Sequence, residues 1–578
     1  MKVLLLALNA KYIHTSLALR SIKAYCKAYE EQITLLETTI NNQENEILHM
    51  IYQAQPTLLG ISCYIWNMQF VKALLPTLRK ILPETTIILG GPEVSYESED
   101  LLYSLPINGL IIGEGEETWK EYLDYRIQGK GYLSEIAGLV YKNEDGIRRN
   151  RPRKPLDLDT LPFVYDTMAD LQHKIIYYEA SRGCPFNCQY CLSSVEKGVR
   201  FVPLEKVKTH LKFFLDERVK QVKFVDRTFN AHRDYALAIW HFLITNDNGQ
   251  TNFHFEIAAE LLTDEMLEVL KAARPGLIQF EIGVQSTNLK VLDIIQRKMP
   301  FEEIREVVLK IKRLKNIHQH LDLIAGLPEE DYTSFSKSFD DVLSVRPEQF
   351  QLGFLKVLKG SGLRCNAEKY GLVYKEEPPY EILYTDALHY DELVRLHGIE
   401  ECVERYYNSQ RFGLTLEYLF AVYASPFTFF ERLSEFWERR GYHQLEHNKL
   451  AYSTKLLAFC EEEQKVPLDA IKDCLRWDYL LKENLNEIPK EWQSLDQSVY
   501  KERNNALLKD ELWIQKTLPH LTTAIPRQRF RLTRIEYFKY DVVTAYHQGL
   551  EPTLTLLKEP IGILFDYSQK PPTFNVLL

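Results

Sequence analysis

The sequence predicts an α/β protein with three parts. These are an N-terminal doubly wound domain of the Rossmann or flavodoxin-like kind, a partial (β/α)6 barrel of the TIM type, and a mainly helical C-terminal domain. Short apolar runs alternate with helical periodicity over residues 1–128 and again over residues 173–365. This alternation is typical of parallel sheets covered by helices. From residue 366 to residue 578 helical periodicity dominates.

The size and composition of the chain limit the possible classes of protein. A length of 578 residues is too great for a single hydrophobic core, so several domains are expected. The hydrophobic share of 45% and the charged share of 26% are ordinary for a soluble globular protein. A formal net charge of −10 argues against a general nucleic-acid binder.

Location is predicted from the apolar runs and the cysteines. No run reaches the roughly 18 apolar residues that span a bilayer, so no membrane association is expected. The opening Met-Lys-Val-Leu-Leu-Leu-Ala-Leu lacks a small-residue cleavage site and predicts a buried strand. Six of the nine cysteines are scattered singly, as buried thiols in a reducing compartment are. A cytoplasmic location is therefore predicted.

The first domain contains five predicted strands, at Val3–Leu8, Ile33–Ile40, Leu58–Tyr64, Thr86–Leu89 and Gly109–Ile112. The predicted helices between them are Ser16–Tyr29, residues 44–53 and Phe70–Ile81. Glycines follow the fourth and fifth strands, at the carboxyl edge where such sheets bind ligands. Glycine also serves ordinary tight turns, so these positions alone are weak indicators of a site.

A connector is predicted over residues 129–172. Gly138–Lys142 and Ile147–Arg149 could pair as a hairpin, because the Asp145-Gly146 pair between them favours a turn. Three prolines follow between Arg151 and Pro162. Proline cannot continue a helix, so this stretch is expected to be extended and to mark a domain boundary.

The second domain has six predicted strands, at Ile175–Ala180, Val222–Val225, Phe253–Ala258, Leu277–Phe280, His320–Leu323 and Gln349–Leu355. Active residues of parallel barrels lie on the loops after the strands. The candidate residues at or beside these strand ends are Asp226, Glu260, Glu281, Gln285, Ser286 and Asp322.

The C-terminal part contains predicted helices at Tyr390–Tyr407, Leu414–Tyr423, Phe427–Arg439 and Leu468–Leu481, and predicted strands at Phe530–Tyr540 and Ile561–Tyr567. The run from Arg527 to Tyr540 mixes basic and aromatic residues. It would suit an anionic or planar substrate, or an edge strand with solvated charges.

The strongest chemical signal is a C-x3-C-x2-C motif formed by Cys184, Cys188 and Cys191. Three closely spaced thiolates suit an iron–sulfur cluster, and three is one fewer than a closed four-thiolate site needs. A zinc site with a distant fourth ligand is the alternative. Zinc ribbons usually show paired C-x2-C knuckles, and this sequence has no second knuckle.

The motif resembles the signature of radical S-adenosylmethionine (SAM) enzymes. The resemblance implies a 4Fe–4S cluster whose open iron is chelated by SAM, and reductive cleavage of SAM to a 5′-deoxyadenosyl radical. Glu281-x-Gly-x-Gln285-Ser286 and Asp322-x-x-x-Gly-Leu-Pro328 look like the fourth- and fifth-strand motifs of these enzymes. The SAM-binding residues implied are Tyr190, Asp226, Glu260, Glu281, Gln285, Ser286 and Asp322.

Two of these assignments have alternatives. Many radical SAM enzymes carry Gly-Gly-Glu after the second strand to receive the SAM amino group, whereas this chain has Asp226-Arg-Thr-Phe-Asn230. Asp226, Glu281 and Asp322 could instead form salt bridges behind the ligand. Tyr190 is expected to pack on the adenine, because a planar ring offers a stacking face, or else to belong to the core.

The N-terminal domain, placed before the cysteines, resembles the cobalamin-binding domain of cobalamin-dependent radical SAM enzymes. Cobalamin-dependent mutases carry D-x-H-x-x-G with a cobalt-binding His, and neither His14 nor His49 lies in such a motif. The resemblance therefore implies cobalamin without that ligand, or a domain of the same fold that has lost cobalamin. The implied cobalamin contacts are Asn9, Tyr12, Ser62, Tyr64, Gly90, Gly91, Pro92, Gly113, Glu114 and Gly115.

The leading functional prediction is a cobalamin-dependent radical SAM methyltransferase acting on an unactivated carbon. Ring formation or rearrangement with the same cofactors, as in a porphyrin-type cyclase, is the main alternative. RNA methylthiotransferase activity and a non-catalytic cobalamin or redox sensor are remoter alternatives. The expected partners are a small-molecule or peptide substrate and a reducing protein such as flavodoxin or ferredoxin, with no membrane and no nucleic acid.

Overall fold

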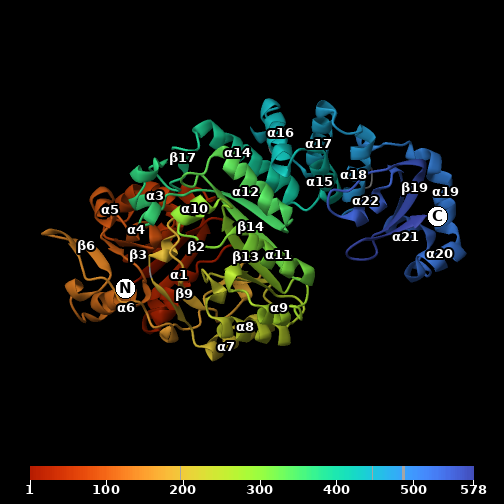
Figure 1. Ribbon diagram of the computed structural model, residues 1–578. Coiled ribbons are helices and arrows are strands. Elements are labelled where there is room, and N and C mark those ends of the chain that lie inside the picture. Colours follow the sequence, from red (N-terminus) through yellow and green to blue (C-terminus); the bar gives the residue numbers. More distant parts are fainter. Residues whose placement is uncertain (196, 445–446, 485–487, 578) are drawn as a thin grey trace. The chain divides into compact units, whose positions relative to one another are not determined.

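The structure is a computed structural model that describes residues 1–195, 197–444, 447–484 and 488–577 (Figure 1). The chain forms two compact units. The first comprises Met1–Phe335 together with Leu352–Tyr390, and the second comprises Ser336–Gln351 together with Asp391–Leu578.

The first unit begins with five parallel strands in the order β2-β1-β3-β4-β5. The strands are β1 (Val3–Asn9), β2 (Ile33–Thr39), β3 (Leu58–Ser62), β4 (Thr86–Gly90) and β5 (Gly109–Ile111). The helices are α1 (Leu17–Tyr25), α2 (Glu44–Ala54), α3 (Met68–Ile81), α4 (Pro92–Ser95), α5 (Ser98–Ser104) and α6 (Glu116–Gln128). The predicted doubly wound domain is confirmed.

Helices cover both faces of this sheet, which explains the continuous apolar run of β1. Leu4, Leu6 and Leu8 pack on one face with residues of α2 and α3. Val3 and Leu5 pack on the other face with residues of α1 and α6. A strand buried on both faces needs apolar residues at every position rather than at alternate ones.

The predicted hairpin is present and belongs to the same sheet. Strands β6 (Leu139–Asn143) and β7 (Gly146–Arg149) pair antiparallel, and β6 pairs with β5. Gly146 has a φ of +118°, which explains the glycine at the tight turn. The sheet of the first domain therefore continues to Arg149, beyond the boundary expected at residue 128.

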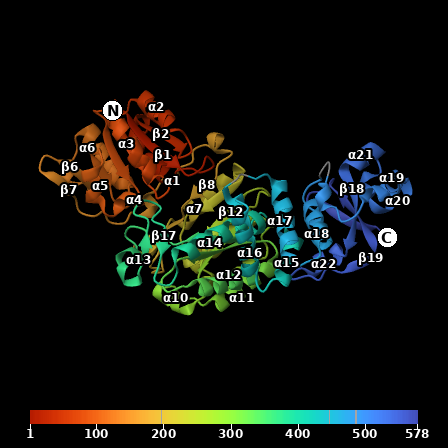
Figure 2. The same cartoon turned by 90° about the horizontal axis from the view of Figure 1, so that it is seen from above.

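The predicted partial barrel is also confirmed as a six-stranded sheet in the order β8-β11-β12-β13-β14-β15. Figure 2 labels β8 and β12 of this sheet. Its strands are β8 (Ile176–Tyr178), β11 (Gln221–Phe224), β12 (Asn252–Glu256), β13 (Ile278–Gln285), β14 (His318–Ala325) and β15 (Gln349–Phe354). Its helices are α7 (Leu204–Asp216), α8 (Arg233–Thr245), α9 (Asp264–Leu270), α10 (Leu289–Ile294), α11 (Phe301–Leu314) and α12 (Tyr332–Ser344).

The two faces of the barrel strands differ in polarity. Val222, Phe253 and Phe280 are fully buried, on the face that packs against helices. The alternate positions of β11 to β14 are polar, whereas the interior of a closed TIM barrel is dominated by branched apolar residues. These polar positions are Gln221, Lys223, Asn252, His254, Glu256, Gln279, Glu281, His318, His320 and Asp322.

A hairpin outside the barrel sheet carries the first cysteine. Strand β9 (Ser181–Cys184) pairs antiparallel with β10 (Gly198–Phe201), so that Cys184 lies opposite Gly198 and Arg182 lies opposite Arg200. The sequence analysis did not predict this hairpin, because its glycines and charged residues lack strand propensity. After β15 the first unit ends with α13 (Gly362–Cys365), β16 (Val373–Tyr374) and β17 (Ile382–Tyr384).

The second unit is mainly helical, as expected, with a three-stranded sheet near its end. Its helices are α14 (Tyr390–Cys402), α15 (Gly413–Val422), α16 (Pro426–Arg439), α17 (Lys449–Glu463), α18 (Leu468–Leu480), α19 (Lys501–Lys509), α20 (Glu511–Thr517), α21 (Pro526–Leu532) and α22 (Val542–Gln548). Its strands, in sheet order, are β18 (Thr533–Tyr540), β19 (Leu556–Asp566) and β20 (Thr573–Leu577).

The basic run from residue 527 to 540 agrees in part with the expected edge strand, because β18 lies at the edge of the three-stranded sheet and Arg527 and Arg531 are exposed. Its first part is the helix α21, and Arg529 there is buried, with its guanidinium bound to Glu511 at 2.8 Å. Most of β18 is also buried. The run is therefore a packed part of the second unit, and Arg529 forms an internal ion pair with Glu511.

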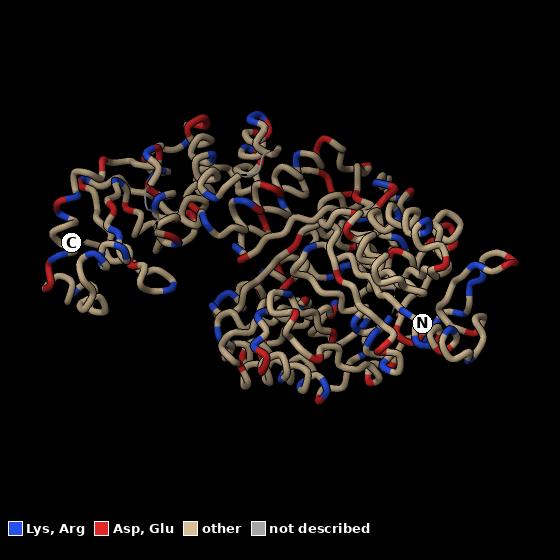
Figure 3. The backbone as a smooth tube through the Cα atoms, turned by 180° about the vertical axis from the view of Figure 1, so that it is seen from behind, with Lys and Arg blue, Asp and Glu red and all other residues tan. Residues whose placement is uncertain are grey.

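No helix in the described part of the chain is long and apolar enough to cross a membrane. Figure 3 shows basic and acidic positions interspersed along the backbone of both units. A mixed distribution of this kind lacks the single-sign stripe with which proteins follow a phosphate backbone.

Candidate active site

The three cysteines lie in one loop that leads from β9 into the turn at Leu192–Ser194. All three are free thiols. The amide of Cys191 donates to the carbonyl of Cys188 at 3.1 Å, and the Ser194 hydroxyl donates to both carbonyls. Cys184 Sγ lies 3.4 Å from the Thr228 hydroxyl. These hydrogen bonds hold the three thiols in one compact loop.

A buried arginine that the sequence analysis missed lies beside this loop. Arg297 follows α10, donates to the carbonyl of Gly283, and interacts electrostatically with Tyr190, Cys188 and Glu260. Its Nε is buried and makes no hydrogen bond. A buried unpaired N–H is costly, and a carboxylate such as that of SAM would satisfy it.

Three predicted SAM-binding residues lie near this arginine, and they differ in exposure and in their contacts. Glu260 lies exposed in the turn after β12. Tyr190 lies against Cys188 and Arg297, and burial raises the pKa of its phenol, so its position favours packing behind the cluster loop. Gln285 ends β13 with a φ of +73°, and its side chain fills the space that a Cβ at Gly283 would need.

Two other predicted SAM residues are bound to protein groups. The Asp226 carboxylate accepts hydrogen bonds from the Ala180 amide at 3.0 Å and the Ser181 hydroxyl at 2.5 Å. Burial raises the pKa of Asp226 to about 7. The Ser286 hydroxyl donates to Glu330 at 2.5 Å. Both side chains therefore hold strand ends in place.

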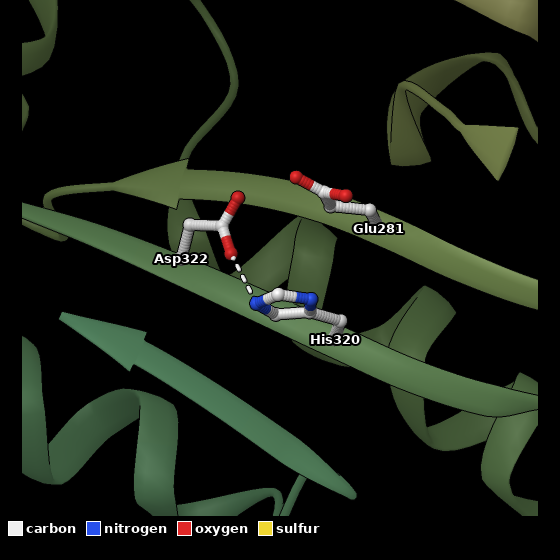
Figure 4. A group of neighbouring side chains, drawn as sticks. All are labelled: Glu281, His320 and Asp322. Carbon is white, nitrogen blue, oxygen red and sulfur yellow. Dashed lines mark ion pairs between the residues drawn. The ribbon is translucent and has the colours of Figure 1, made fainter. Parts of the chain in front are cut away.

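Glu281 and Asp322 face the same side of β13 and β14 (Figure 4). Glu281 is 3.0 Å from Lys223 Nζ and 2.9 Å from His254 Nε2, and His320 Nε2 is 3.0 Å from Asp322. Burial raises the pKa of Glu281, but His254 and Lys223 outweigh it and hold that pKa below its ordinary value.

Figure 4 also shows that Glu281, His320 and Asp322 converge, with ligand atoms within 4.8 Å of one another. Their geometry would admit a metal ion. The Lys223 ammonium already compensates the Glu281 carboxylate, so an added cation would be repelled at this point. The group is better described as a charged network on the inner face of the barrel, in line with the salt-bridge alternative.

A cavity of about 870 Å³ lies where the two sheets of the first unit meet. One side is formed by the carboxyl ends of β1, β3, β4 and β5, and the other by those of β8, β11 and β12. Nine predicted cobalamin residues line it, namely Asn9, Ser62, Tyr64, Gly90, Gly91, Pro92, Gly113, Glu114 and Gly115. Tyr12 instead lies 68% exposed, with Lys174 Nζ 3.8 Å from its ring centre.

One part of the cavity lining, here called the apolar shaft, is formed by apolar residues between the sheet and helices α1 and α6. Leu5, Gly60, Ile88 and Trp119 line it. A Cβ at Gly60 would lie 2.7 Å from the Trp119 ring, so only glycine leaves this space. Cobalamin combines a broad corrin with a nucleotide tail that ends in a planar aromatic base. A cavity of this volume, with apolar residues along part of its lining, fits the corrin and the aromatic base.

Two histidines also line the cavity. His14 Nδ1 is 2.6 Å from the Tyr177 hydroxyl, and burial lowers the pKa of His14. His210 Nδ1 is 3.0 Å from the Tyr178 hydroxyl, and burial lowers its pKa to about 4. Both imidazoles are therefore neutral at pH 7. His49 lies exposed on α2.

The carboxylates of the Gly113–Glu116 loop point toward the cysteine hairpin. Glu116 is 2.5 Å from Arg182, and Glu114 is 2.5 Å from Arg200. The glycines of this loop line the cavity while its glutamates bind β9 and β10. The sequence analysis predicted Glu114 as a cobalamin contact. The structure adds that this carboxylate is already paired.

A second connection comes from the segment after β15. The Tyr380 hydroxyl donates to Glu93 at 2.7 Å, and a Cβ at Gly360 would lie 2.5 Å from the Tyr96 ring. The Leu363 amide donates to the carbonyl of Gln189, within the cysteine loop, at 2.9 Å. Residues 358–382, here called the strap, therefore contact both the cobalamin-side loop and the cluster loop.

Three family models match the chain in succession. Residues 3–123 match the B12 binding domain, residues 178–342 match the radical SAM superfamily, and residues 368–565 match the protein of unknown function DUF4080. The first two matches fall on the two halves of the cavity. The chain belongs to the B12-binding radical SAM enzyme family. Its cofactors are a 4Fe–4S cluster, SAM and cobalamin.

Distant relatives of this radical SAM enzyme are methyltransferases. It is 25% identical over 425 residues to 2-(S-pantetheinyl)-carbapenam-3-carboxylate methyltransferase of Streptantibioticus cattleyicolor, covering 67% of this chain and 62% of the relative. It is 24% identical over 354 residues to the cobalamin-dependent radical SAM methyltransferase TokK of Streptomyces tokunonensis, covering 56% and 51%. The chain thus spans about half to two thirds of these relatives.

The fold is also found in a solved structure. The radical SAM methyltransferase TsrM of Kitasatospora setae, determined with cobalamin and a 4Fe–4S cluster, matches with a TM-score of 0.55 and 15% sequence identity. The match covers 66% of this chain and 79% of TsrM. At this identity the likeness concerns the fold.

Proposed function

We propose that this radical SAM enzyme transfers a methyl group to an unactivated carbon of a small polar substrate. The observation that carries the proposal is the cavity that the cobalamin-side loops share with the carboxyl ends of the barrel strands. When bound, the cluster and SAM supply a 5′-deoxyadenosyl radical, and cobalamin supplies a transferable methyl group. A shared cavity lets both reach one substrate carbon. The distant methyltransferases support the same reaction class.

Different residues of the chain would bind SAM and contact the substrate. Arg297 would bind the SAM carboxylate, with Glu260 and Gln285 on the same side of the barrel. Tyr177, Lys223 and Glu256 line the cavity and face the substrate. Burial raises the pKa of Glu256, which lies 3.8 Å from Arg227, so this carboxyl can accept or share a proton with a bound polar group.

Water exclusion would come from the connector between the two domains. Leu161, Pro162 and Phe163 line the cavity, and the Phe163 ring stacks on His210 with 4.3 Å between ring centres. An apolar wall at this point protects a reactive radical from solvent. The proline-rich stretch predicted as a plain connector thus has a place in the site.

The polar inner face of the barrel indicates the substrate class. Its histidines, lysine and carboxylates suit a hydrogen-bonding small molecule or the polar end of a peptide better than a hydrocarbon. We propose that the electron comes from a reducing protein such as flavodoxin or ferredoxin in a reducing cytosol. Pro185 and Asn187 of the cluster loop are exposed, which gives such a partner access.

The test is anaerobic reconstitution of the full chain with iron, sulfide, cobalamin and a reductant, followed by incubation with a cell extract and SAM labelled on its methyl group. Methyl transfer predicts a product that carries the label, together with 5′-deoxyadenosine. A new unlabelled product with fewer hydrogens would favour the cyclase alternative. A labelled methylthio group on RNA would favour the methylthiotransferase, and absence of 5′-deoxyadenosine would favour a sensor.

A further inference from the structure

Arg182 connects the cluster hairpin to the cobalamin-side loop. It lies on β9 two residues before Cys184, so the two side chains emerge on the same face of the strand. Its guanidinium is 16% exposed and contacts three carboxylates. The distances are 2.5 Å to Glu116, 3.0 Å to Glu179 and 3.3 Å to Glu114.

The partners of Arg182 are themselves fixed. Glu114 also accepts from Arg200 at 2.5 Å and from the Leu156 amide at 2.6 Å. Glu116 accepts from the Ser21 hydroxyl of α1 at 3.0 Å. Arg182 therefore does not simply neutralise a mobile surface carboxylate. It reaches into a set of carboxylates that α1, the connector and β10 hold in place.

The loop that supplies Glu114 and Glu116 also forms a wall of the cavity. Gly113 in this loop has a φ of +75°, and Gly113 and Gly115 both line the cavity. A ligand that fills the cavity presses on the same four residues whose carboxylates hold the cysteine hairpin. A change in the position of this loop would therefore be carried to Cys184 through one guanidinium.

The charges make this connection hard to replace. Two guanidiniums face three carboxylates, and Arg182 is the one cation within 4.0 Å of Glu116 among the described ion pairs. Removing it would leave Glu116 and Glu179 buried without compensation, which is unfavourable. Lysine would keep the charge but could not reach three carboxylates at once, because it lacks the planar fork of arginine.

We propose that Arg182 is a positioning residue that couples occupation of the cobalamin cavity to SAM binding at the cluster. Coupling of this kind is reciprocal, so cobalamin tightens SAM and SAM tightens cobalamin by the same factor. A factor of about 5 to 10 lies at the lower end of the usual range for coupled sites. The proposal rests on the cofactors of the family and does not depend on which carbon is methylated.

The experiment measures SAM binding to the full-length protein with its cluster reconstituted and no reductant present, so that no turnover occurs. Equilibrium dialysis gives the Kd for SAM with and without saturating hydroxocobalamin. The wild-type ratio is expected to be about 5 to 10. In Arg182→Met the ratio is expected to fall to near 1 with cluster iron retained, and Arg182→Lys is expected to recover part of it.

Arg153 offers a matched control. It is as deeply buried, and its guanidinium binds Glu117 at 2.8 Å and also Glu121, but it does not contact the cysteine hairpin in the described contacts. Arg153→Met should therefore keep the wild-type ratio. If Arg182→Met fails to incorporate iron, Glu116→Gln weakens the shortest of the three contacts from the opposite side and is expected to lower the ratio.

Two results would overturn the proposal. One is a wild-type ratio of 1, which would mean that the two cofactors bind independently. The other is a ratio that stays at the wild-type value in Arg182→Met or, where that variant lacks iron, in Glu116→Gln. Either result would leave methyl transfer untouched, because labelled-product formation is measured separately.

Discussion

Asp226 and Ser181 form a buried hydrogen bond of 2.5 Å that joins the loop after β11 to the start of the cysteine hairpin. The sequence analysis placed Asp226 against SAM. The structure shows its carboxylate turned toward the protein, where it also accepts from the Ala180 amide. An acid in this position fixes where the hairpin begins.

The first prediction concerns the charge of this acid. Burial raises the pKa of Asp226 from 3.8 to about 7, so the folded protein holds the proton more tightly than the unfolded chain. Its contribution to stability is fully present below pH 3.8 and is lost as the pH rises to about 7. Asp226→Asn mimics the protonated form. The Asn variant should lose less thermal stability than wild type between pH 5 and pH 8.

The size of that difference has an upper limit. Three pKa units correspond to no more than about 4 kcal/mol, and relaxation around the site reduces this figure. The measurement is the thermal unfolding midpoint of both proteins at pH 5, 6, 7 and 8. Parallel curves for the two proteins would show that Asp226 does not titrate in this range.

The second prediction concerns Arg297. Arg297→Met removes the buried cation beside Cys188 and should raise the Kd for SAM by about 10- to 100-fold, the value of one charge-assisted contact. Hydroxocobalamin titration of the same variant without SAM should match wild type. A SAM affinity within twofold of wild type would contradict the assigned role of this side chain.

The third prediction tests the cysteines. Replacing Cys184, Cys188 or Cys191 by Ala should abolish iron incorporation and SAM cleavage, because three thiolates are the minimum ligand set for the cluster. Cobalamin should still bind, since none of the three cysteines is among the described residues that line its cavity. Iron analysis and the visible spectrum of bound cobalamin check both parts. Cys365→Ala is a suitable control, because this exposed thiol lies outside the motif.

The fourth prediction concerns the apolar shaft. In Gly60→Val the new side chain would displace Trp119, whose ring already lies 2.7 Å from the position of a Cβ. The displaced indole would occupy the shaft, so cobalamin affinity should fall by at least about tenfold, equal to about 1.4 kcal/mol. SAM cleavage without cobalamin should persist. Unchanged cobalamin affinity would show that the tail does not enter the shaft.

The fifth prediction concerns the cobalt ligand. His14 lines the cavity, but it is bound to Tyr177 and lies outside a D-x-H-x-x-G motif. Cobalamin bound to the reduced protein should therefore show an electron paramagnetic resonance spectrum without nitrogen coupling from the protein. His14→Gln should leave that spectrum unchanged. Nitrogen coupling that disappears in His14→Gln would identify this imidazole as a ligand.

The parallel sheets and the cysteine triad could be predicted because their signals are local. A strand buried on both faces reads as an apolar run, and three thiols within eight residues can hardly serve separate sites. The partners of Arg297 and Arg182 could not be predicted. Their contacts join residues up to 109 positions apart, and no spacing rule reports which way a charged side chain turns.

Errors of orientation follow from the same cause. Asp226 follows a strand as active-site acids do, yet it turns inward because two donors at Ala180 and Ser181 lie within reach. Tyr12 belongs to a matching segment, yet it lies on the surface, where Lys174 covers its ring. Sequence spacing indicated loops that line the cavity, while local donors and charges decide which side chains of those loops face it.

The strap has a consequence for how the enzyme is made in the cell. Its contacts with Glu93, Tyr96 and Gln189 come from residues 358–382, long after the segments that they hold together. Translation proceeds from the N-terminus at roughly 5 to 20 residues per second, so the first domain, which ends at Arg149, emerges many seconds before the strap does. During that interval the contacts of the strap with Glu93, Tyr96 and Gln189 have not yet formed. Cofactors can therefore enter the cavity during synthesis before the contacts of the strap have formed.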